Sequence, residues 1–413
     1  MNSIYSLMKK IQLWGIKGIW NYLIRQIVNN KKRKFFLRNA TSHPMIPCKG
    51  ITIIADMTGK AALSKTMRDF AFALKKSNIP FQTFDLSPSK DIPKNDIKNI
   101  LTPVKDFRIL KYTHVIEMFS SPLPRTLPLK RSSIFFWEFT SGLSEYFPNI
   151  KNFKNVVAMS DFNYEVFKNT FPKSTEVKKI LYPFFFCGKN IPEKQITRAK
   201  YSIPEDAFTV FFNFDYNSSF NRKNPDGSLR AFAKAFPFEK NTRLIFKTKG
   251  AKEHLDDRNR LLQLSEELTI TDRVVMIDEF IPTDDIYGLT SACDVYLSLH
   301  RGEGFGLGIV EAMSLGKPVV VTDFSATTEF CNHENSIPIP YSIVKVPPAM
   351  HDHPCYHAVT EWAEPDIEAA ARALKKLYSD NSLRQRIGNS ARSFIEEHFS
   401  IENFRQSVEN FLQ

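Results

Sequence analysis

The sequence predicts an α/β protein with two doubly wound domains, each built on a parallel sheet. Short apolar runs of strand length alternate with longer helical runs, in two series separated by a polar segment. At 413 residues the chain is long enough for two domains, and its 43% hydrophobic content is typical of a globular protein. Thirty-six phenylalanines predict aromatic-rich cores.

The first series predicts a domain at residues 49–190, after a basic segment at 1–48. Apolar runs predict strands, and the longer segments between them predict helices that cross from one parallel strand to the next. The polar stretch 184–200, with Gly188 and Pro192, predicts the linker. The predicted strands are 50–56, 81–86, 112–119, 132–139 and 155–160, and the predicted helices are 61–76 and 163–171.

The second series predicts a domain at residues 191–395, followed by a last segment at 396–413. One helix has clear end signals, because Gly316 can close it in the left-handed conformation and Pro318 cannot continue it. Ligands in such sheets bind at the carboxyl ends of strands, so we expect a cleft between the two domains to hold the site. The predicted strands are 209–214, 244–247, 274–277, 294–300 and 319–322, and the predicted helices are 228–236, 253–268, 284–292 and 309–315.

The most informative motif is HRGEGFGLGIVEAM, residues 300–313, between a predicted strand and a predicted helix. Four of the fifteen glycines lie within residues 302–308, which favours close approach of a ligand to the backbone. Such a loop brings N–H groups and a helix N-terminus to one point, an arrangement suited to phosphate. Its two carboxylates, Glu303 and Glu311, can accept hydrogen bonds from sugar hydroxyls. The glycine spacing does not match the dinucleotide-binding fingerprint.

This motif resembles the donor-site signature of the GT-B glycosyltransferases, in particular glycosyltransferase family 4. The signature has a Glu, then Gly-Phe-Gly-Leu, a second Glu eight positions after the first, then Ala-Met and Gly-x-Pro-Val; all of these occur here. The resemblance implies that Glu303 contacts the donor sugar and that Glu311 holds the ribose hydroxyls. His300 either touches the sugar or caps the strand. The loop residues implied to meet sugar and phosphate are Gly304, Phe305, Gly306 and Leu307.

A second constellation, Arg222 and Lys223 in RKNP, follows the first predicted strand of the second domain. Two fixed cations at that place can stabilise a departing diphosphate electrostatically. Family 4 enzymes place an Arg and a Lys here, and Lys223 is the better-matched position. The alternative is a solvated basic pair that begins a helix.

The resemblance is looser in the first domain. The family's glycine-rich loop after the first strand corresponds to MTGKAALSK, residues 57–65, with Gly59 alone. Many members carry a histidine on the strand at 112–119, where the candidates here are His114 and Glu117. His114 is equally compatible with a core role. The last helix, about 401–412, is implied to pack back on the first domain.

Positive charge is concentrated at the N-terminus. Residues 1–50 carry ten Lys or Arg and no Asp or Glu, within a net charge of +12. Apolar residues recur there at helical spacing, with tryptophans among lysines, which predicts that residues 1–39 lie on an anionic membrane surface. A helix packed on the first domain is the alternative. No recognition motif accompanies the charge, so nucleic acid is not an expected partner.

Cysteine usage and hydropathy predict a cytoplasmic protein, and the basic N-terminal segment predicts a peripheral place on the inner face of the plasma membrane. Five scattered cysteines indicate a reducing cytoplasm. No apolar run of membrane-spanning length and no signal peptide is recognisable. We expect no metal, since no Asp-x-Asp occurs. HDHPCYH, residues 351–357, is a weak candidate for zinc.

The resemblance implies a retaining, metal-independent glycosyltransferase with no protein nucleophile. Its expected co-substrate is a nucleotide sugar, and its expected acceptor is a glycan or lipid-linked glycan in lipopolysaccharide or polysaccharide synthesis. Two alternatives remain open: another GT-B enzyme, such as a phosphorylase or an epimerase, and a non-catalytic subunit that binds a nucleotide sugar.

Overall fold

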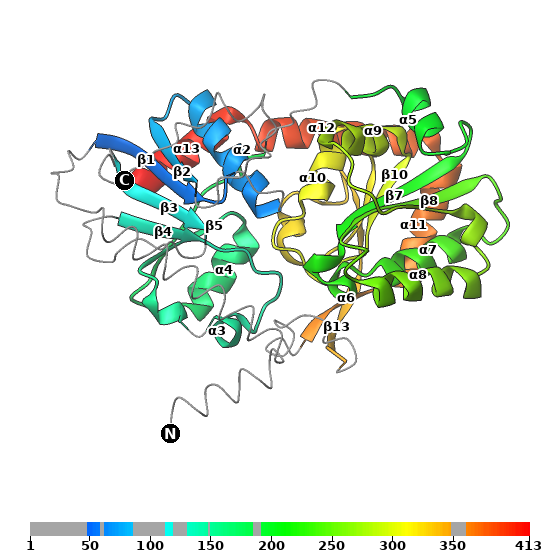
Figure 1. The fold of residues 1–413 in the computed structure, drawn as a ribbon, viewed down its shortest axis with the longest axis horizontal. Coiled ribbons are helices and arrows are strands. Elements are labelled where there is room, and N and C mark those ends of the chain that lie inside the picture. The colour runs from blue at the N-terminus through cyan, green and yellow to red at the C-terminus, as the bar shows by residue number, and fades with distance from the viewer. Residues whose placement is uncertain are drawn as a thin grey trace. The chain divides into compact units, whose positions relative to one another are not determined.

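The computed structural model describes residues 48–57, 62–85, 112–118, 130–147, 149–184, 191–347 and 361–413. The chain divides into two compact units, each with its own sheet (Figure 1). Unit 1 comprises Met1–Phe136, Leu143–Phe185 and Phe399–Gln413, and unit 2 comprises Trp137–Gly142 and Phe186–His398. The last segment of the chain therefore groups with unit 1.

Unit 1 is built on a six-stranded parallel sheet of order β2-β1-β3-β4-β5-β6. Helices α2, α3, α4 and α13 complete its described part. The strands are β1 (Cys48–Ala55), β2 (Phe81–Asp85), β3 (Tyr112–Met118), β4 (Lys130–Ile134), β5 (Asn155–Ala158) and β6 (Glu176–Lys179). The helices are α2 (Ala62–Lys76), α3 (Leu143–Tyr146), α4 (Asp161–Thr170) and α13 (Ile401–Leu412).

Aromatic packing fills unit 1, as the phenylalanine content predicts. The buried ring of Phe135 meets Phe147, Phe153 and Phe171 edge to face, with ring centroids 5.5, 4.9 and 5.7 Å away. Phe135 follows β4, so the predicted strand 132–139 leaves the sheet early.

Helix α13 packs against unit 1. The ring of Phe404 meets that of Phe70 on α2 with centroids 5.6 Å apart. The Ser407 hydroxyl accepts a hydrogen bond from the Leu181 N–H, and Lys178 Nζ donates to the Phe411 carbonyl oxygen at 3.1 Å. Phe404 and Phe411 are both buried, so α13 supplies part of the core of this unit.

Unit 2 is built on a second six-stranded parallel sheet, of order β12-β11-β10-β7-β8-β9. A small antiparallel sheet, β13 (Tyr341–Lys345) with β14 (Glu361–Pro365), adjoins it in sequence. The six strands are β7 (Phe208–Asp215), β8 (Thr242–Lys249), β9 (Val274–Ile277), β10 (Val295–Ser298), β11 (Val319–Thr322) and β12 (Ile337–Ile339). The helices are α5 (Lys194–Lys200), α6 (Phe220–Lys223), α7 (Pro225–Ala235), α8 (Leu255–Glu267), α9 (Thr283–Ala292), α10 (Leu307–Ser314), α11 (Ile367–Ser379) and α12 (Asn381–His398).

The predicted class, two α/β units with doubly wound parallel sheets, is confirmed by this topology. The predicted linker 184–200 is too long, because residues 194–200 form α5. Arg198 explains the difference: its side chain is buried and donates to the carbonyl oxygens of Ala207 and Ala292 at 2.8 and 2.9 Å. A segment that is polar in sequence is thus fixed to unit 2 by the hydrogen bonds of one arginine.

Candidate functional site

Two segments 80 residues apart meet at the carboxyl ends of neighbouring strands β7 and β10 of unit 2. The Lys223 ammonium pairs with Glu303 Oε1, and Arg222 Nη1 lies 3.5 Å from the same oxygen. The side chains of Arg222 and Glu303 are almost entirely buried, and that of Lys223 is 18% exposed. The structure therefore brings both predicted cations and the first predicted carboxylate into direct contact.

Helix α6 holds the two cations in a single turn with a cap at each end. The Ser219 hydroxyl accepts from the Arg222 N–H at 3.3 Å and begins the turn. Asn224 ends it in the left-handed conformation (φ 55°), and its side chain accepts from the Gly227 N–H to begin α7. The Asn224 amide also donates to the Leu299 carbonyl oxygen at 2.9 Å, which ties α6 to the segment after β10.

Arg301 joins the cation segment to the glycine loop. Its backbone N–H donates to the Arg222 carbonyl oxygen at 2.8 Å, and its Nη1 donates to the Asn221 carbonyl oxygen at 2.6 Å. The guanidinium makes a two-pronged ion pair with Glu364 on β14 (2.6 and 2.8 Å) and stacks 4.7 Å from the Trp362 ring centre. In return, Arg222 Nη1 donates to the Gly302 carbonyl oxygen at 2.8 Å. These reciprocal hydrogen bonds fix the distance between the two segments.

The charges of the site perturb one another. Burial alone raises the pKa of the Glu303 carboxyl, but Lys223 and Arg222 outweigh it and lower that pKa to about 2. The pKa of Lys223 is also lowered, by burial and then by the second cation, Arg222, despite the opposing effect of Glu303. Glu303 therefore faces two cations, which keep its carboxylate ionised although it is buried.

Glu138 supplies a second carboxylate that the sequence did not single out as a site residue. It follows β4 in the chain but groups with unit 2, and its Oε1 lies 3.6 Å from Arg222 Nη2. Its contact with Arg222 is visible in the structure alone.

The glycine loop has its conformation fixed by packing. The Glu303 N–H donates to the Ser325 hydroxyl at 2.8 Å, and the Phe305 ring packs on Phe330 with centroids 5.5 Å apart. Gly306 has φ 94° and caps α10, and a Cβ added there lies 2.8 Å from a Thr327 methyl carbon. Gly304 is buried within the loop, and Leu307 is the first residue of α10. The predicted anion cradle is thus a loop that leads into a helix N-terminus.

Glu311 lies on α10 and is almost entirely buried. Tyr287 donates to its Oε1 at 3.4 Å. In the first turn of the same helix, a Cβ added at Gly308 lies 2.4 Å from the Tyr296 hydroxyl, which itself donates to Asn213 Oδ1 at 2.5 Å. Glycine at position 308 therefore lets α10 approach the sheet closely.

His300 is fully buried beneath the loop. Its Nε2 lies 3.3 Å from the Phe324 carbonyl oxygen, which can only accept, so Nε2 carries the proton. Its Nδ1 then accepts from the Ser298 hydroxyl at 3.2 Å. Burial is the largest effect on its pKa, which falls to about 4, so the ring is neutral at pH 7. Both nitrogens hydrogen-bond to the protein, which favours a role for His300 in supporting the loop.

The candidates of the first domain are not gathered into one cluster. Glu117 lies near the carboxyl end of β3, buried, and accepts from the Ser133 hydroxyl at 3.1 Å. His114 lies three residues nearer the amino end, against the Phe411 ring of α13, and burial lowers its pKa. This position favours a packing role. Gly59 and the candidate zinc segment 351–357 lie outside the described residues.

Among the residues that the structure describes, no group of three or more His, Cys, Asp or Glu side chains is placed to hold a metal ion. No helix in this part of the chain is long and apolar enough to cross a membrane.

The sequence of unit 2 matches a known family. Residues 193–340 match the model of the family Glycosyl transferases group 1. Within those residues the chain is similar to glycosyltransferases of group 1. The matched residues contain the Arg222–Lys223 pair, the glycine loop and both carboxylates, Glu303 and Glu311.

Similar proteins point the same way. Over 76 residues the chain is 36% identical to the lipopolysaccharide core biosynthesis mannosyltransferase LpsB of Rhizobium meliloti (strain 1021), a match that covers 18% of the chain and 21% of that protein. Over 218 residues it is 25% identical to the serotype-specific mannosyltransferase WbdA of Escherichia coli, covering 52% of the chain and 24% of that protein. The matches span about a quarter or less of the length of these curated relatives.

A solved structure is similar over most of the chain. Anabaena Alr3699/HepE, crystallised in complex with UDP-glucose, superposes with a TM-score of 0.63 at 15% identity, covering 88% of this chain and 99% of that one. The predicted GT-B fold and the predicted resemblance to GT-B glycosyltransferases are confirmed. Assignment to family 4 stays a prediction.

Proposed function

We propose that this chain is a glycosyltransferase that moves a sugar from a nucleotide-sugar donor to a glycan or lipid-linked acceptor in lipopolysaccharide or polysaccharide synthesis. The observation that carries the proposal is the contact of Lys223 and Arg222 with Glu303, next to the glycine loop that begins α10. The relatives named for lipopolysaccharide core biosynthesis and serotype support the acceptor class.

The residues divide the chemistry between them. In the proposed reaction, Lys223 and Arg222 hold the diphosphate and stabilise the negative charge that develops as the glycosidic bond to it breaks. Glu303 holds the sugar, Glu311 the ribose hydroxyls, and the backbone of residues 304–307 approaches sugar and phosphate. Lys223 shares its Glu303 partner with Arg222, so a phosphate can take the place of the carboxylate beside Lys223.

We propose retention of the anomeric configuration, by departure of the diphosphate and attack of the acceptor on the same face, without a protein nucleophile. The two cations would neutralise the leaving group in place of a metal. The anomer of the product, read by NMR, tests retention, and unchanged turnover in EDTA tests metal independence. An inverted product or loss of turnover in EDTA contradicts the respective proposal.

Thermal stabilisation by a panel of nucleotide sugars is the first test. A ligand that binds only the folded state raises apparent stability by mass action, by about 2.7 kcal/mol at a hundredfold excess over Kd. We expect one nucleotide sugar to raise the Tm of the wild type, and Glu311→Ala and Lys223→Ala to lose that response. Lys234→Ala is the matched control, since this exposed lysine on α7 pairs with Glu368. No response from a folded wild type, or an equal response in all variants, contradicts the site.

Turnover separates the alternatives. Slow hydrolysis of the stabilising nucleotide sugar supports a transferase. Release of a sugar phosphate that requires inorganic phosphate identifies a phosphorylase, and an epimer formed without acceptor identifies an epimerase. Binding without any of these reactions identifies a non-catalytic subunit.

We also propose that residues 1–39, which lie outside the described residues, bind a membrane surface. This contact would place the protein on the inner face of the plasma membrane. Removal of residues 1–39 is expected to weaken cosedimentation of the chain with anionic vesicles at low salt. Cosedimentation equal to that of the full chain contradicts this role.

A further inference from the structure

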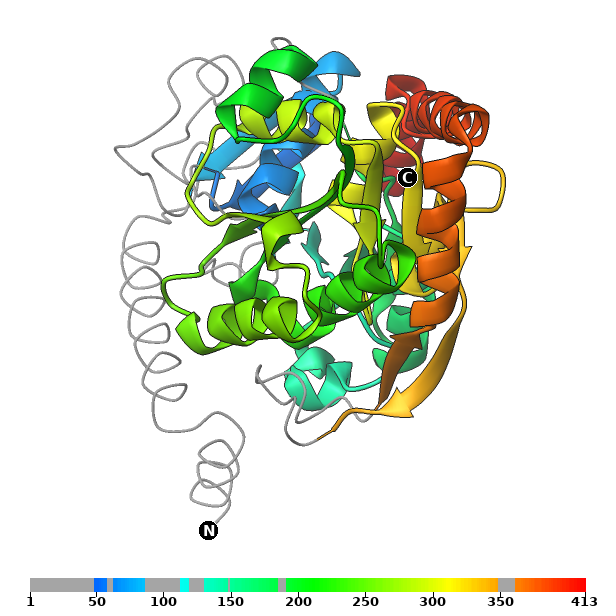
Figure 2. The ribbon, with the colours of Figure 1, turned by 90° about the vertical axis from the view of Figure 1, so that its right-hand side faces the viewer.

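A groove on unit 2 carries three cations that make no ion pair with any residue that the structure describes: Arg372, Lys376 and Arg386. The groove has a volume of about 360 Å³ and runs beside β12, the edge strand of the sheet, between α11 and α12. Figure 2 turns α11, the orange helix, toward the viewer. Among the residues that the structure describes, no acidic side chain lines this groove.

The helices build the groove from complementary stripes. On α11, Ala369, Arg372, Ala373 and Lys376 follow one another at helical spacing, so two small side chains alternate with two cations on one face. On α12, Leu383 and Ile387 flank Arg386 in the same way. The alanines leave space near the helix axis, and the buried apolar side chains form the floor.

Neighbouring cations on the same helices are neutralised. Lys375 on α11 pairs with Glu239, and Arg392 on α12 pairs with Glu396 at 2.8 Å. Two nearby acids are engaged elsewhere: Glu368 pairs with Lys234, and Asp380 accepts from the Leu383 N–H. The groove therefore holds three cations with no carboxylate among its described lining residues, whereas Lys375 and Arg392 on the same two helices each face one.

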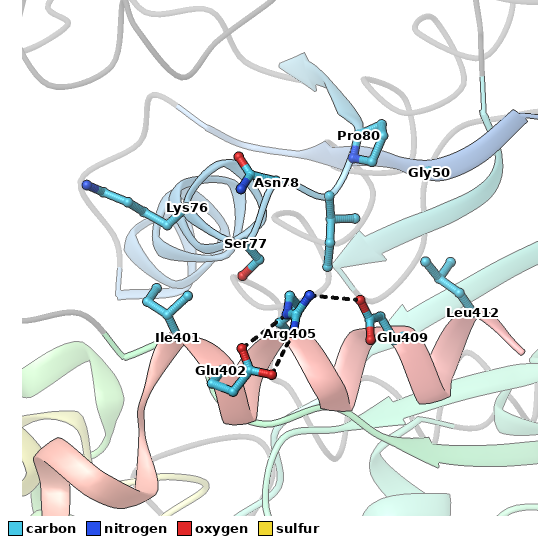
Figure 3. Close-up of a pocket in the computed structure, with 11 residues that line it drawn as sticks. Gly50, Lys76, Ser77, Asn78, Pro80, Ile401, Glu402, Arg405, Glu409 and Leu412 are labelled. Carbon is cyan, nitrogen blue, oxygen red and sulfur yellow. Dashed lines mark hydrogen bonds and ion pairs between the residues drawn. The ribbon is translucent and has the colours of Figure 1, made fainter.

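A second cavity on the protein shows the contrast. A pocket of about 480 Å³ in unit 1, between α13 and the end of α2, contains Arg405 (Figure 3). There Glu402 and Glu409, which line the same pocket, pair with the guanidinium at 2.7 and 3.8 Å. That pocket balances its own charge, whereas the α11–α12 groove does not.

We infer that the α11–α12 groove binds a phosphate anion that carries two or more negative charges. Arginine donates hydrogen bonds to phosphate in pairs, and Arg372 and Arg386 approach the groove from two different helices. Three cations without a carboxylate disfavour a metal ion, and an apolar floor offers a neutral sugar few hydrogen bonds. The anion can be a soluble diphosphate or the headgroup of a membrane phospholipid. This site is separate from the β7–β10 donor site and does not rest on the proposed function.

Charge-matched double variants of the full chain test the inference. Arg372→Gln/Arg386→Gln removes one groove cation from each helix, and Lys375→Gln/Arg392→Gln removes one paired cation from each of the same helices. Net charge, the donor site and the basic N-terminal segment are the same in both variants. Thermal unfolding of the ligand-free proteins checks that both remain folded.

Two measurements distinguish the sources of the phosphate. Inorganic pyrophosphate binding is followed by calorimetry, and we expect it to weaken on the order of tenfold in the groove variant. Cosedimentation with phosphatidylcholine vesicles that contain phosphatidic acid, whose monoester phosphate can carry two negative charges, is expected to weaken about fivefold for each groove cation removed. A selective loss with pyrophosphate alone identifies a soluble ligand, and a selective loss with vesicles alone identifies a headgroup.

The inference is overturned if the groove variant and its control bind pyrophosphate equally and also bind vesicles equally. This holds whether both variants retain binding or both lose it. The result is independent of the donor site, because neither double variant touches Lys223, Glu303 or Glu311. If nucleotide sugars fail to stabilise the wild type while the groove variant loses phosphate binding, the proposed function fails and the groove stands.

Discussion

His300 illustrates how burial turns a residue of the glycine motif into a support. It lies one position before Arg301 and three before Glu303, yet both ring nitrogens hydrogen-bond to the protein. The proton sits on Nε2 because a carbonyl oxygen faces it. A neutral ring at this place holds Ser298 and Phe324 together under the loop.

His300 is expected to make stability pH-dependent. Its pKa falls from an ordinary 6.5 to about 4 on folding, so the unfolded chain binds the proton more tightly. Its contribution is present above pH 6.5 and is lost as the pH falls toward 4, with about 2 kcal/mol lost between pH 7 and pH 5. Urea unfolding of wild type and His300→Gln at these two pH values measures it. A pH dependence that is the same in both proteins contradicts this account.

The Arg301 side chain joins three segments: the glycine loop, the segment of Asn221 and strand β14. Arg301→Lys keeps the charge but cannot reproduce the fork to Glu364 together with the Asn221 hydrogen bond. We expect a loss of about 2 kcal/mol in the free energy of unfolding. We also expect a weaker thermal response to the nucleotide sugar, since α6 loses its anchor.

The control for Arg301 is Arg392→Lys, in an exposed pair with Glu396 on α12. Its expected change is within about 0.5 kcal/mol. Equal losses in the two variants, or an unchanged ligand response in Arg301→Lys, are the results that contradict a positioning role.

At the scale of the element, helix α10 depends on a glycine at each end. Gly306 and Gly316 stand at the two ends of this helix with φ 94° and 68°. The space around them differs: the nearest atom to an added Cβ lies 2.8 Å away at Gly306, a Thr327 methyl carbon, and 3.7 Å away at Gly316. The N-terminal end is therefore the more constrained.

Gly316→Ala is expected to cost about 1 kcal/mol, the strain of a left-handed alanine alone. Gly306→Ala adds the collision with Thr327, so we expect a cost of about 2 kcal/mol or more and loss of the nucleotide-sugar response. Denaturant unfolding and the thermal shift measure the two effects. A Gly306→Ala protein that is as stable as Gly316→Ala and still responds to the ligand contradicts this reading of the loop.

At the scale of the whole molecule, the last helix of the chain stabilises the first unit. Phe404 on α13 is buried against Phe70, and removal of its ring leaves a cavity. We expect Phe404→Ala to lower the free energy of unfolding of unit 1 by about 3–5 kcal/mol. Phe238→Ala is the control, since this ring is 85% exposed and is expected to change little.

Limited proteolysis shows which of the two units the Phe404→Ala substitution destabilises. Unit 1 is expected to become susceptible in Phe404→Ala under conditions in which fragments of unit 2 persist, because the units have separate cores. Cleavage that begins in unit 2 contradicts the assignment of α13 to the core of unit 1.

Much of the fold was readable in the sequence, because strand and helix signals are local. Period and length predict β7, β8, β9, β10 and β11 within a few residues of their observed bounds. Short or polar elements were not predicted from the sequence. Strand β6 has the sequence EVKK, and helix α5 carries a buried arginine. Their stability comes from partners distant in sequence, which no local pattern reports.

The donor-site motif was determined by the sequence itself. Each of its features occupies a short stretch of sequence: the glycine spacing, the two carboxylates eight positions apart, and the Arg-Lys pair after a strand. The residue types alone indicate backbone N–H groups, carboxylates and cations at the site. Tertiary structure alone decided which groups these residues meet: Lys223 and Arg222 on one Glu303 oxygen, Glu138 beside Arg222, and Arg301 bound to Glu364. Each of those contacts joins residues that are 63 or more positions apart along the chain, so it forms only when folding brings distant segments together.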